Sequence, residues 1–190
     1  MKPMKFLVLP ILIALIFTLS AKSAEASNLY LSTPSNQIQN GDSFQVDVRL
    51  NTQNEDLNAV QSNLNFPADK LEIVSITQTN SFPILAEQTV SGGLIQLAQG
   101  SLSPVNGDVP VATITFKAKS AGTANLSFNT DSAAPRFADS SDSLDLAQSS
   151  GINLTINEAG PSATPVATQT QSQTLSFASI WNLISKLFNS

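Results

Sequence analysis

The strongest constraint in this sequence is an alternation of apolar and polar residues that runs through most of the chain. Every second side chain is apolar in four separate runs: Phe44–Leu50, Ala112–Ala118, Ala124–Phe128 and Ile152–Ile156. Successive side chains of a β-strand point to opposite faces, so each run predicts a strand with one buried and one solvated face. Turn-forming pairs such as Asn40-Gly41 and Asn106-Gly107 separate the runs. This pattern, with no stretch of helical period between Leu29 and Asn157, predicts an all-β protein, an antiparallel β-sandwich.

Two segments of this region depart from simple alternation. Residues 71–76 are apolar on both faces, which predicts a bulge or a strand that crosses from the edge of a sheet to its core. Residues 131–150 are rich in Ser and Asp, and we expect them to form a long loop with at most one short strand. The sandwich is therefore predicted over residues 27–157.

The composition excludes several classes of function. The chain has 190 residues and contains neither Cys nor His. It therefore has no disulfide framework, no thiolate or imidazole zinc site, and no Ser-His-Asp triad. A net charge of −5 argues against a nucleic-acid partner, which would need a basic face. No pair of carboxylates stands out as the acid and base of a glycosidase, so we expect a protein that is not an enzyme.

The first residues have the pattern of an export signal. Lys2 and Lys5 precede an apolar run from Phe6 to Leu19, and Ala24-Glu25-Ala26 follows. A membrane-spanning helix needs about 20 apolar residues, so this run is too short for an anchor. A charged start, a short apolar run and an A-x-A site are typical of a secretory signal peptide. We predict that residues 1–26 are removed and that the protein is secreted or held at the cell surface.

The composition changes after Asn157. Residues 158–175 are rich in Pro, Ser, Thr and Gln and have too few large apolar side chains to fold, so they predict a linker. Residues 176–190 carry one apolar stripe at helical spacing. This stripe consists of Phe177, Ile180, Trp181, Ile184, Leu187 and Phe188. It predicts a short amphipathic helix that docks on the sandwich, self-associates or lies weakly at a membrane surface, and we favour the last two.

Several segments of the sandwich resemble those of cohesin domains. They are Leu29-Tyr30-Leu31, Gly41–Val48, Phe66–Ile73, Val111–Ala118 and Phe137-Ala138-Asp139. Their order and spacing are those of that family, and the resemblance extends over residues 28–157. The resemblance implies a jelly-roll sandwich of about nine strands. It also implies a non-catalytic receptor that captures dockerin modules in extracellular assemblies, often ones that degrade polysaccharides. The family needs no cofactor, and any calcium is expected on the dockerin.

The resemblance directs attention to the family's third strand, residues 59–66 here. Alternation turns Val60, Ser62, Leu64 and Phe66 inward, and it leaves Gln61, Asn63 and Asn65 outward as uncharged candidates for partner binding. Gln96, on a neighbouring strand, is the next candidate. In the best-known cohesins an Asn and an Asp contact the dockerin at the positions of Ala59 and Gln61. An ordinary solvated sheet face would have the same pattern.

Two alternatives remain at this stage. Carbohydrate-binding modules of this fold stack sugar rings on exposed Trp or Tyr, and the predicted sandwich holds only Tyr30, so direct sugar binding is the second hypothesis, ahead of a purely structural surface module. Asp139, Asp142 and Asp145 could together bind calcium, which prefers oxygen ligands. Their spacing is not that of an EF-hand loop, and we favour a solvated acidic loop.

Overall fold

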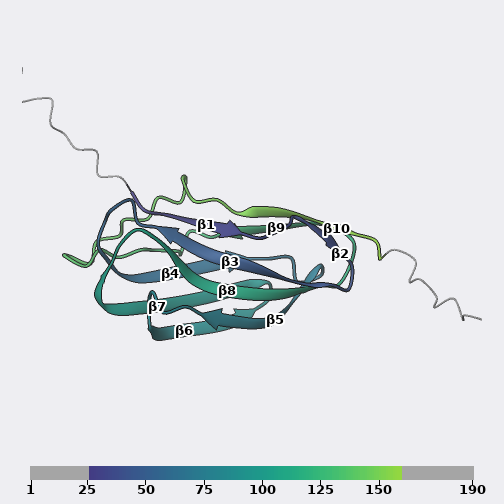
Figure 1. Cartoon of the computed structure of the whole chain (residues 1–190), viewed down its shortest axis with the longest axis horizontal. Helices are drawn as coiled ribbons and strands as arrows, with labels where there is room; N and C mark the ends of the chain where they lie inside the picture. Colours follow the sequence, from purple (N-terminus) through teal and green to yellow (C-terminus); the bar gives the residue numbers. More distant parts are fainter. Residues whose placement is uncertain (1–25, 160–190) are drawn as a thin grey trace, which may run out of the picture. The chain divides into compact units, whose positions relative to one another are not determined.

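The computed structural model describes residues 26–159, the coloured part of Figure 1. Nearly all of the predicted signal peptide, linker and C-terminal helix lies outside these residues. The unit is built from ten strands in two sheets. No helix of the described part is long and apolar enough to cross a membrane.

One sheet has four strands and the other has six. The four-stranded sheet has the order β1-β3-β8-β5: β1 (Asn28–Ser32), β3 (Ser43–Asn51), β8 (Asp108–Ala118) and β5 (Leu71–Gln78). The six-stranded sheet has the order β2-β10-β9-β4-β7-β6: β2 (Gln37–Gln39), β10 (Ile152–Asn157), β9 (Gly122–Phe128), β4 (Leu57–Asn65), β7 (Leu94–Val105) and β6 (Ile84–Ser91). Every pairing except β2 with β10 is antiparallel. The predicted jelly-roll sandwich is therefore confirmed.

The first strand of the sandwich is divided between the two sheets. β1 pairs with β3, whereas β2 pairs with β10 on the opposite layer. Between them lies Pro34, which has no N–H to donate to a sheet and therefore favours a break in the strand. This division raises the strand number of the described part to ten.

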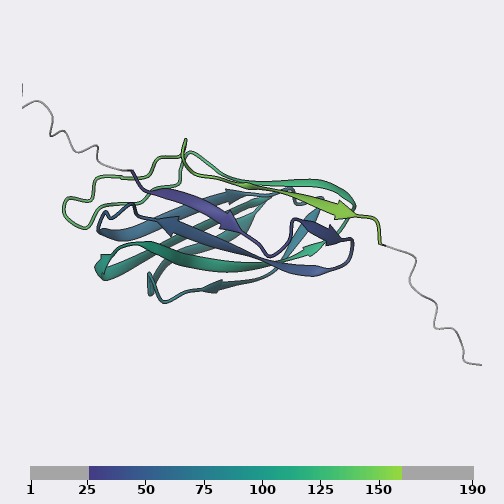
Figure 2. The same ribbon diagram turned by 45° about the horizontal axis from the view of Figure 1, so that its top comes forward.

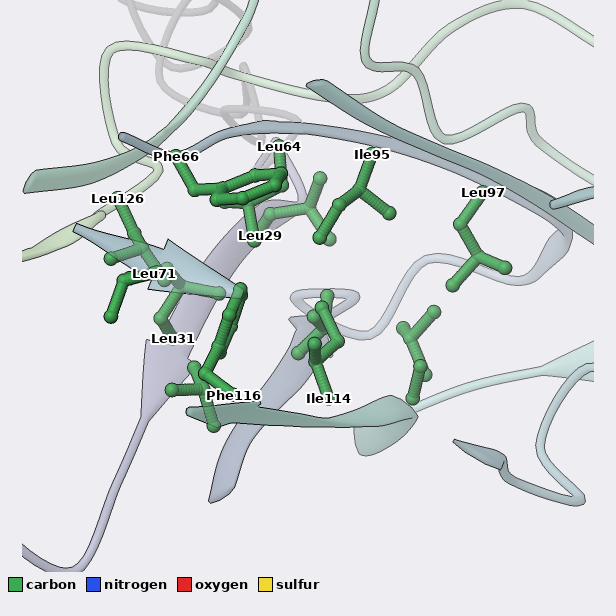
Figure 3. Close-up of a cluster of buried hydrophobic side chains, with 14 of the residues drawn as sticks. Leu29, Leu31, Leu64, Phe66, Leu71, Ile95, Leu97, Ile114, Phe116 and Leu126 are labelled. Atoms are coloured by element: carbon green, nitrogen blue, oxygen red, sulfur yellow. The ribbon is translucent and has the colours of Figure 1, made fainter. Parts of the chain in front are cut away.

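The core lies between the sheets and is made of the inward side chains that alternation predicts (Figure 3). The ring of Phe116 on β8 lies 5.6 Å from the ring of Phe66, which follows β4, and 5.9 Å from the ring of Phe44 on β3. Phe116 thus packs against aromatic rings from both sheets. Aromatic side chains bury about 150–250 Å² each, so these rings contribute strongly to a core that is otherwise mostly aliphatic.

Residues 71–76 contain the predicted bulge. Ile73 pairs with Phe116 and Ser75 pairs with Thr115, which leaves Val74 between them without a partner on β8. Val74 is 57% exposed. The segment is apolar on both faces because the extra residue turns one apolar side chain out of the core.

The long connection from β9 to β10 forms isolated β-bridges but no continuous strand, in agreement with the loop predicted for residues 131–150. It runs along the upper side of the view in Figure 2. Its first part lies beside β4, where Gln61 and Ala133 exchange backbone hydrogen bonds of 2.8 and 2.9 Å. This connection therefore covers the edge of β4 that β9 leaves free beyond Leu64.

Candidate functional site

The two sheets differ in the charges they carry. The strands of the four-stranded sheet hold five charged residues: Asp47, Arg49, Glu72, Asp108 and Lys117. The strands of the larger six-stranded sheet hold one, Glu87 on β6. The outer face of the six-stranded sheet is therefore almost uncharged. Such a face loses little hydration energy when another protein covers it.

Two of the charged residues of the four-stranded sheet pair with each other. The guanidinium of Arg49 lies 3.1 Å from the carboxylate of Asp108, and its Nε donates to the Tyr30 hydroxyl at 2.7 Å. The Tyr30 hydroxyl in turn donates to Asp108 at 2.8 Å. Partial burial raises the pKa of Tyr30 above its ordinary value, and the hydrogen bond to Asp108 raises it further. This face is a network of internal polar contacts.

The same network covers the aromatic ring on which a sugar would have to stack. The Arg49 guanidinium carbon lies 5.9 Å from the centroid of the Tyr30 ring, in a cation–π arrangement. Tyr30 is the only tyrosine of the chain. One face of its ring is thus covered by Arg49, which makes Tyr30 a poor platform for stacking a sugar.

A groove of about 200 Å³ lies on the six-stranded sheet where small side chains of β4, β7 and β6 meet. We call it the outer groove. It is lined by Ala59, Val60, Gln61, Ile84, Ala86, Ala98, Gln99, Gly100, Ala133 and Pro135. The register explains the hollow, because Ala59 lies opposite Gly100 and Gln61 lies opposite Ala98. Side chains this short leave space above the sheet that longer neighbours enclose.

The residues of the predicted partner face differ in exposure and in contacts. Gln61 lines the outer groove, and Asn65 is exposed at the end of β4. Gln96 is half-buried and accepts a hydrogen bond of 3.2 Å from the Thr89 hydroxyl. The inward positions Val60, Ser62, Leu64 and Phe66 are buried, as predicted.

Asn63 is predicted to be exposed, and this prediction is wrong. It is completely buried, and its Nδ2 donates to the backbone oxygen of Asp131 at 3.2 Å. Its backbone N–H donates to the Ser132 hydroxyl at 3.1 Å. The connection after β9 folds over β4 at this point, and local alternation cannot reveal a cover that comes from nearly 70 residues further along the chain.

Sequence reasoning missed most of the lining of the outer groove. Ala98 and Gly100 occupy alternate positions of one strand, and Ala59 occupies the corresponding face of its neighbour. Small residues on the solvent side of adjacent strands were the available signal. Ala133 and Pro135 gave no such signal, because they join the groove from the irregular connection after β9.

A second hollow, of about 420 Å³, lies at one end of the sandwich between β5 and the turn from β6 to β7. Phe66, Leu71, Ile73 and Val90 supply its apolar lining, and Lys119 lies at its rim. The ammonium group of Lys119 donates to the backbone oxygen of Ala68 at 2.9 Å. The one cation of this hollow is therefore already bound within the domain.

The three aspartates of the long connection organise its turns. Asp139 accepts from the Ser141 hydroxyl at 2.7 Å and from the Ser141 N–H at 2.9 Å, and these bonds lower the pKa of Asp139. Asp142 accepts from the N–H groups of Ala134 and Leu144. Asp145 accepts from the N–H of Ala147. Within residues 26–159 no three acidic side chains are grouped so that they could hold a metal ion.

The order of strands, the two-layer packing and the connection folded over β4 can be compared with known proteins. The family model of the cohesin domain matches residues 28–158, most of the chain. The chain belongs to the cohesin domain family. No curated protein sequence matches it.

Solved structures show the same fold. The cohesin module of a family 33 glycoside hydrolase from Clostridium perfringens has a TM-score of 0.61 and 16% identity, and the match covers 70% of this chain and 98% of that one. The seventh ScaB type I cohesin of Pseudobacteroides cellulosolvens has a TM-score of 0.60, 14% identity and coverages of 72% and 95%. A cohesin–dockerin complex of Clostridium thermocellum has a TM-score of 0.57, 10% identity and coverages of 70% and 94%.

Proposed function

We propose that this cohesin domain is a non-catalytic docking module, and that it binds a dockerin-type protein through the outer face of its six-stranded sheet. The observation that carries the proposal is the outer groove on a sheet with a single charged residue. Interfaces between proteins have centres depleted of charge and rims that are polar. The outer groove provides such a centre, and Gln61, Asn65 and Gln96 provide polar groups around it.

The partner class comes from the family. Solved cohesins that share this fold have been captured with dockerins, among them the complexes of Clostridium thermocellum. We extend that partner class to this chain. The four-stranded sheet is the poorer candidate for the same role, because it carries five charged residues, and its one tyrosine is already engaged by Arg49 and Asp108.

We also propose that the module works outside the cytoplasm, in an assembly that acts on polysaccharides. The signal-peptide pattern of residues 1–26 supports export, and the apolar stripe with Ile180, Trp181 and Ile184, followed by Leu187 and Phe188, supports a position at a surface. The polysaccharide context rests on the family resemblance and on the similarity to the cohesin module of a glycoside hydrolase. Intact-mass measurement on exported protein should give a chain that begins at Ser27. Protein that retains residues 1–26 would contradict the export proposal and leave the docking proposal untouched.

The docking proposal is tested with a panel of purified, calcium-loaded dockerin modules. At least one module should bind the full chain in a calorimetric titration, and a chelator should abolish the binding because dockerins fold around calcium. Ala98→Arg, in the outer groove, should weaken that binding at least about tenfold, since it places a charge at the centre of the interface. Its control is Thr115→Arg on β8, which should change the affinity less than about twofold.

Two outcomes would contradict the proposal. One is that no dockerin of the panel binds while the chain is retained on insoluble polysaccharide, which would favour the carbohydrate-binding alternative. The other is that Thr115→Arg abolishes the binding and Ala98→Arg does not, which would place the docking surface on the four-stranded sheet.

A further inference from the structure

Glu87 is in an unusual position for an isolated charge. It is the single charged residue on the strands of the six-stranded sheet, and it lies opposite Ala98, which lines the outer groove. Its carboxylate has one hydrogen bond among the described residues, a long one of 3.4 Å from the Thr89 hydroxyl. No cation of residues 26–159 pairs with it. Glu87 is therefore an exposed carboxylate at the margin of an apolar hollow.

The carboxylates of the four-stranded sheet provide the contrast. Asp108 is paired with Arg49 at 3.1 Å, and Asp47 accepts a hydrogen bond of 2.6 Å from Thr113. Glu72 lies opposite Lys117 in the register of β5 and β8. Asp47 and Asp108 thus have close partners on a neighbouring strand, and Glu72 has a cation opposite it in the register, whereas Glu87 lies opposite Ala98 and has only a distant hydroxyl.

The groove itself selects an apolar group. Its lining is mostly Ala, Gly, Pro and Ile, which offer methyl and methylene surface, and its volume of about 200 Å³ suits a single side chain rather than a helix or a strand. Burying one large apolar side chain is worth about 1.5–3 kcal/mol. An occupant that is apolar at its tip and cationic beside it would satisfy the groove and Glu87 together.

We infer that the docking partner presents a large aliphatic or aromatic side chain next to a Lys or Arg, with the apolar side chain in the outer groove and the cation on Glu87. The inference rests on the proposed docking function and names the chemistry of its partner. The apolar side chain supplies most of the affinity, because it is the part that becomes fully buried. The cation stays at the rim, where it steers association and fixes orientation.

The charge is tested by association kinetics with the dockerin module that the wild-type chain captures. Glu87→Gln should lower the association rate about two- to fivefold at low salt, and Glu87→Lys should lower it about tenfold or more. Both substitutions should flatten the decrease of the association rate with added salt. The matched control is Glu72→Lys on the four-stranded sheet, which makes the same change in net charge and should leave the salt dependence steeper than Glu87→Lys does.

The groove is tested by filling it. Ala98→Phe should weaken the same complex at least about tenfold, chiefly through faster dissociation, because the partner's apolar side chain loses its place. Thr115→Phe on the opposite sheet is the control and should change the affinity less than about twofold. Melting temperatures equal to that of the wild-type chain would show that neither variant loses binding through unfolding.

The outcomes separate this inference from the docking proposal. If Glu87→Lys behaves like Glu72→Lys, or if Ala98→Phe binds as tightly as the wild-type chain, the inferred partner chemistry is wrong. Docking on the six-stranded sheet would still stand in that case if Ala98→Arg abolishes the binding. If no dockerin binds the wild-type chain, the docking proposal itself fails.

Discussion

The two sheets of this sandwich are built on the same alternating pattern, yet their outer faces differ in kind. On the four-stranded sheet, Arg49, Asp108 and Tyr30 bind one another. On the six-stranded sheet, small and amide side chains surround a groove, and one carboxylate lies at its margin without a close partner. The inward side chains of both sheets form the core that stabilises the fold. The difference between the outer halves shows that a candidate site is found by asking which polar groups the domain itself leaves unsatisfied.

The largest effect is expected where the two sheets meet. Phe116→Ala removes the ring that packs against both Phe44 and Phe66 and should lower the free energy of unfolding by about 3–5 kcal/mol. Both outer faces should be lost together in chemical denaturation, since one core supports them. Phe137→Ala, at a ring that is 42% exposed, is the control and should cost much less. A Phe116→Ala variant as stable as the control would mean that the core is not shared.

The next effect separates two neighbours on one strand. Asn63→Ala removes the donor to the backbone oxygen of Asp131 inside the protein and should cost about 1–3 kcal/mol. Gln61→Ala, two residues earlier, should change stability by less than about 0.5 kcal/mol and should weaken docking instead. Urea unfolding and calorimetric titration of both variants check the pair. A stable Asn63→Ala variant would show that the connection after β9 does not cover β4 as described.

These neighbours also show how far sequence reasoning reached. Alternation was sufficient for the sandwich and its inward side chains, because the period of a strand is local and each residue reports its own face. It also predicted an irregularity over residues 71–76, either a bulge or a crossing strand, and the structure has a bulge there at Val74. It failed at Asn63, and it missed Ala133 and Pro135, because those environments depend on a connection that returns to β4 from far along the chain. Contacts of that kind are set by topology and not by local period.

A smaller effect is expected on the four-stranded sheet. Asp108→Asn breaks the ion pair with Arg49, whose side chain is 28% exposed against 49% for Asp108. Pairs this exposed contribute about 0.2–1 kcal/mol, so the melting temperature should fall only slightly. Dockerin binding should be unchanged. A loss of binding in Asp108→Asn without unfolding would assign the docking role to the charged face.

The smallest effect is a spectroscopic one at Tyr30. Because this is the only tyrosine of the chain, the ultraviolet absorbance of tyrosinate reports its ionisation alone. The pKa is raised by burial and by Asp108, so the midpoint should lie above 10.0 and should fall toward it in Asp108→Asn. A group whose pKa is raised by folding stabilises the fold below its unfolded pKa. This contribution should therefore be present below about pH 10 and lost as the pH rises through the folded pKa.

We propose that the six-stranded sheet, and not the four-stranded sheet, is the docking face. The chain has no native cysteine, so this proposal can be measured directly. Single cysteines at Ala98 and at Thr115 can be alkylated with and without the captured, calcium-loaded dockerin. The proposed docking face predicts that the dockerin slows the alkylation of Ala98→Cys at least about tenfold and leaves the rate at Thr115→Cys unchanged. Protection of Thr115→Cys with free alkylation of Ala98→Cys would contradict it.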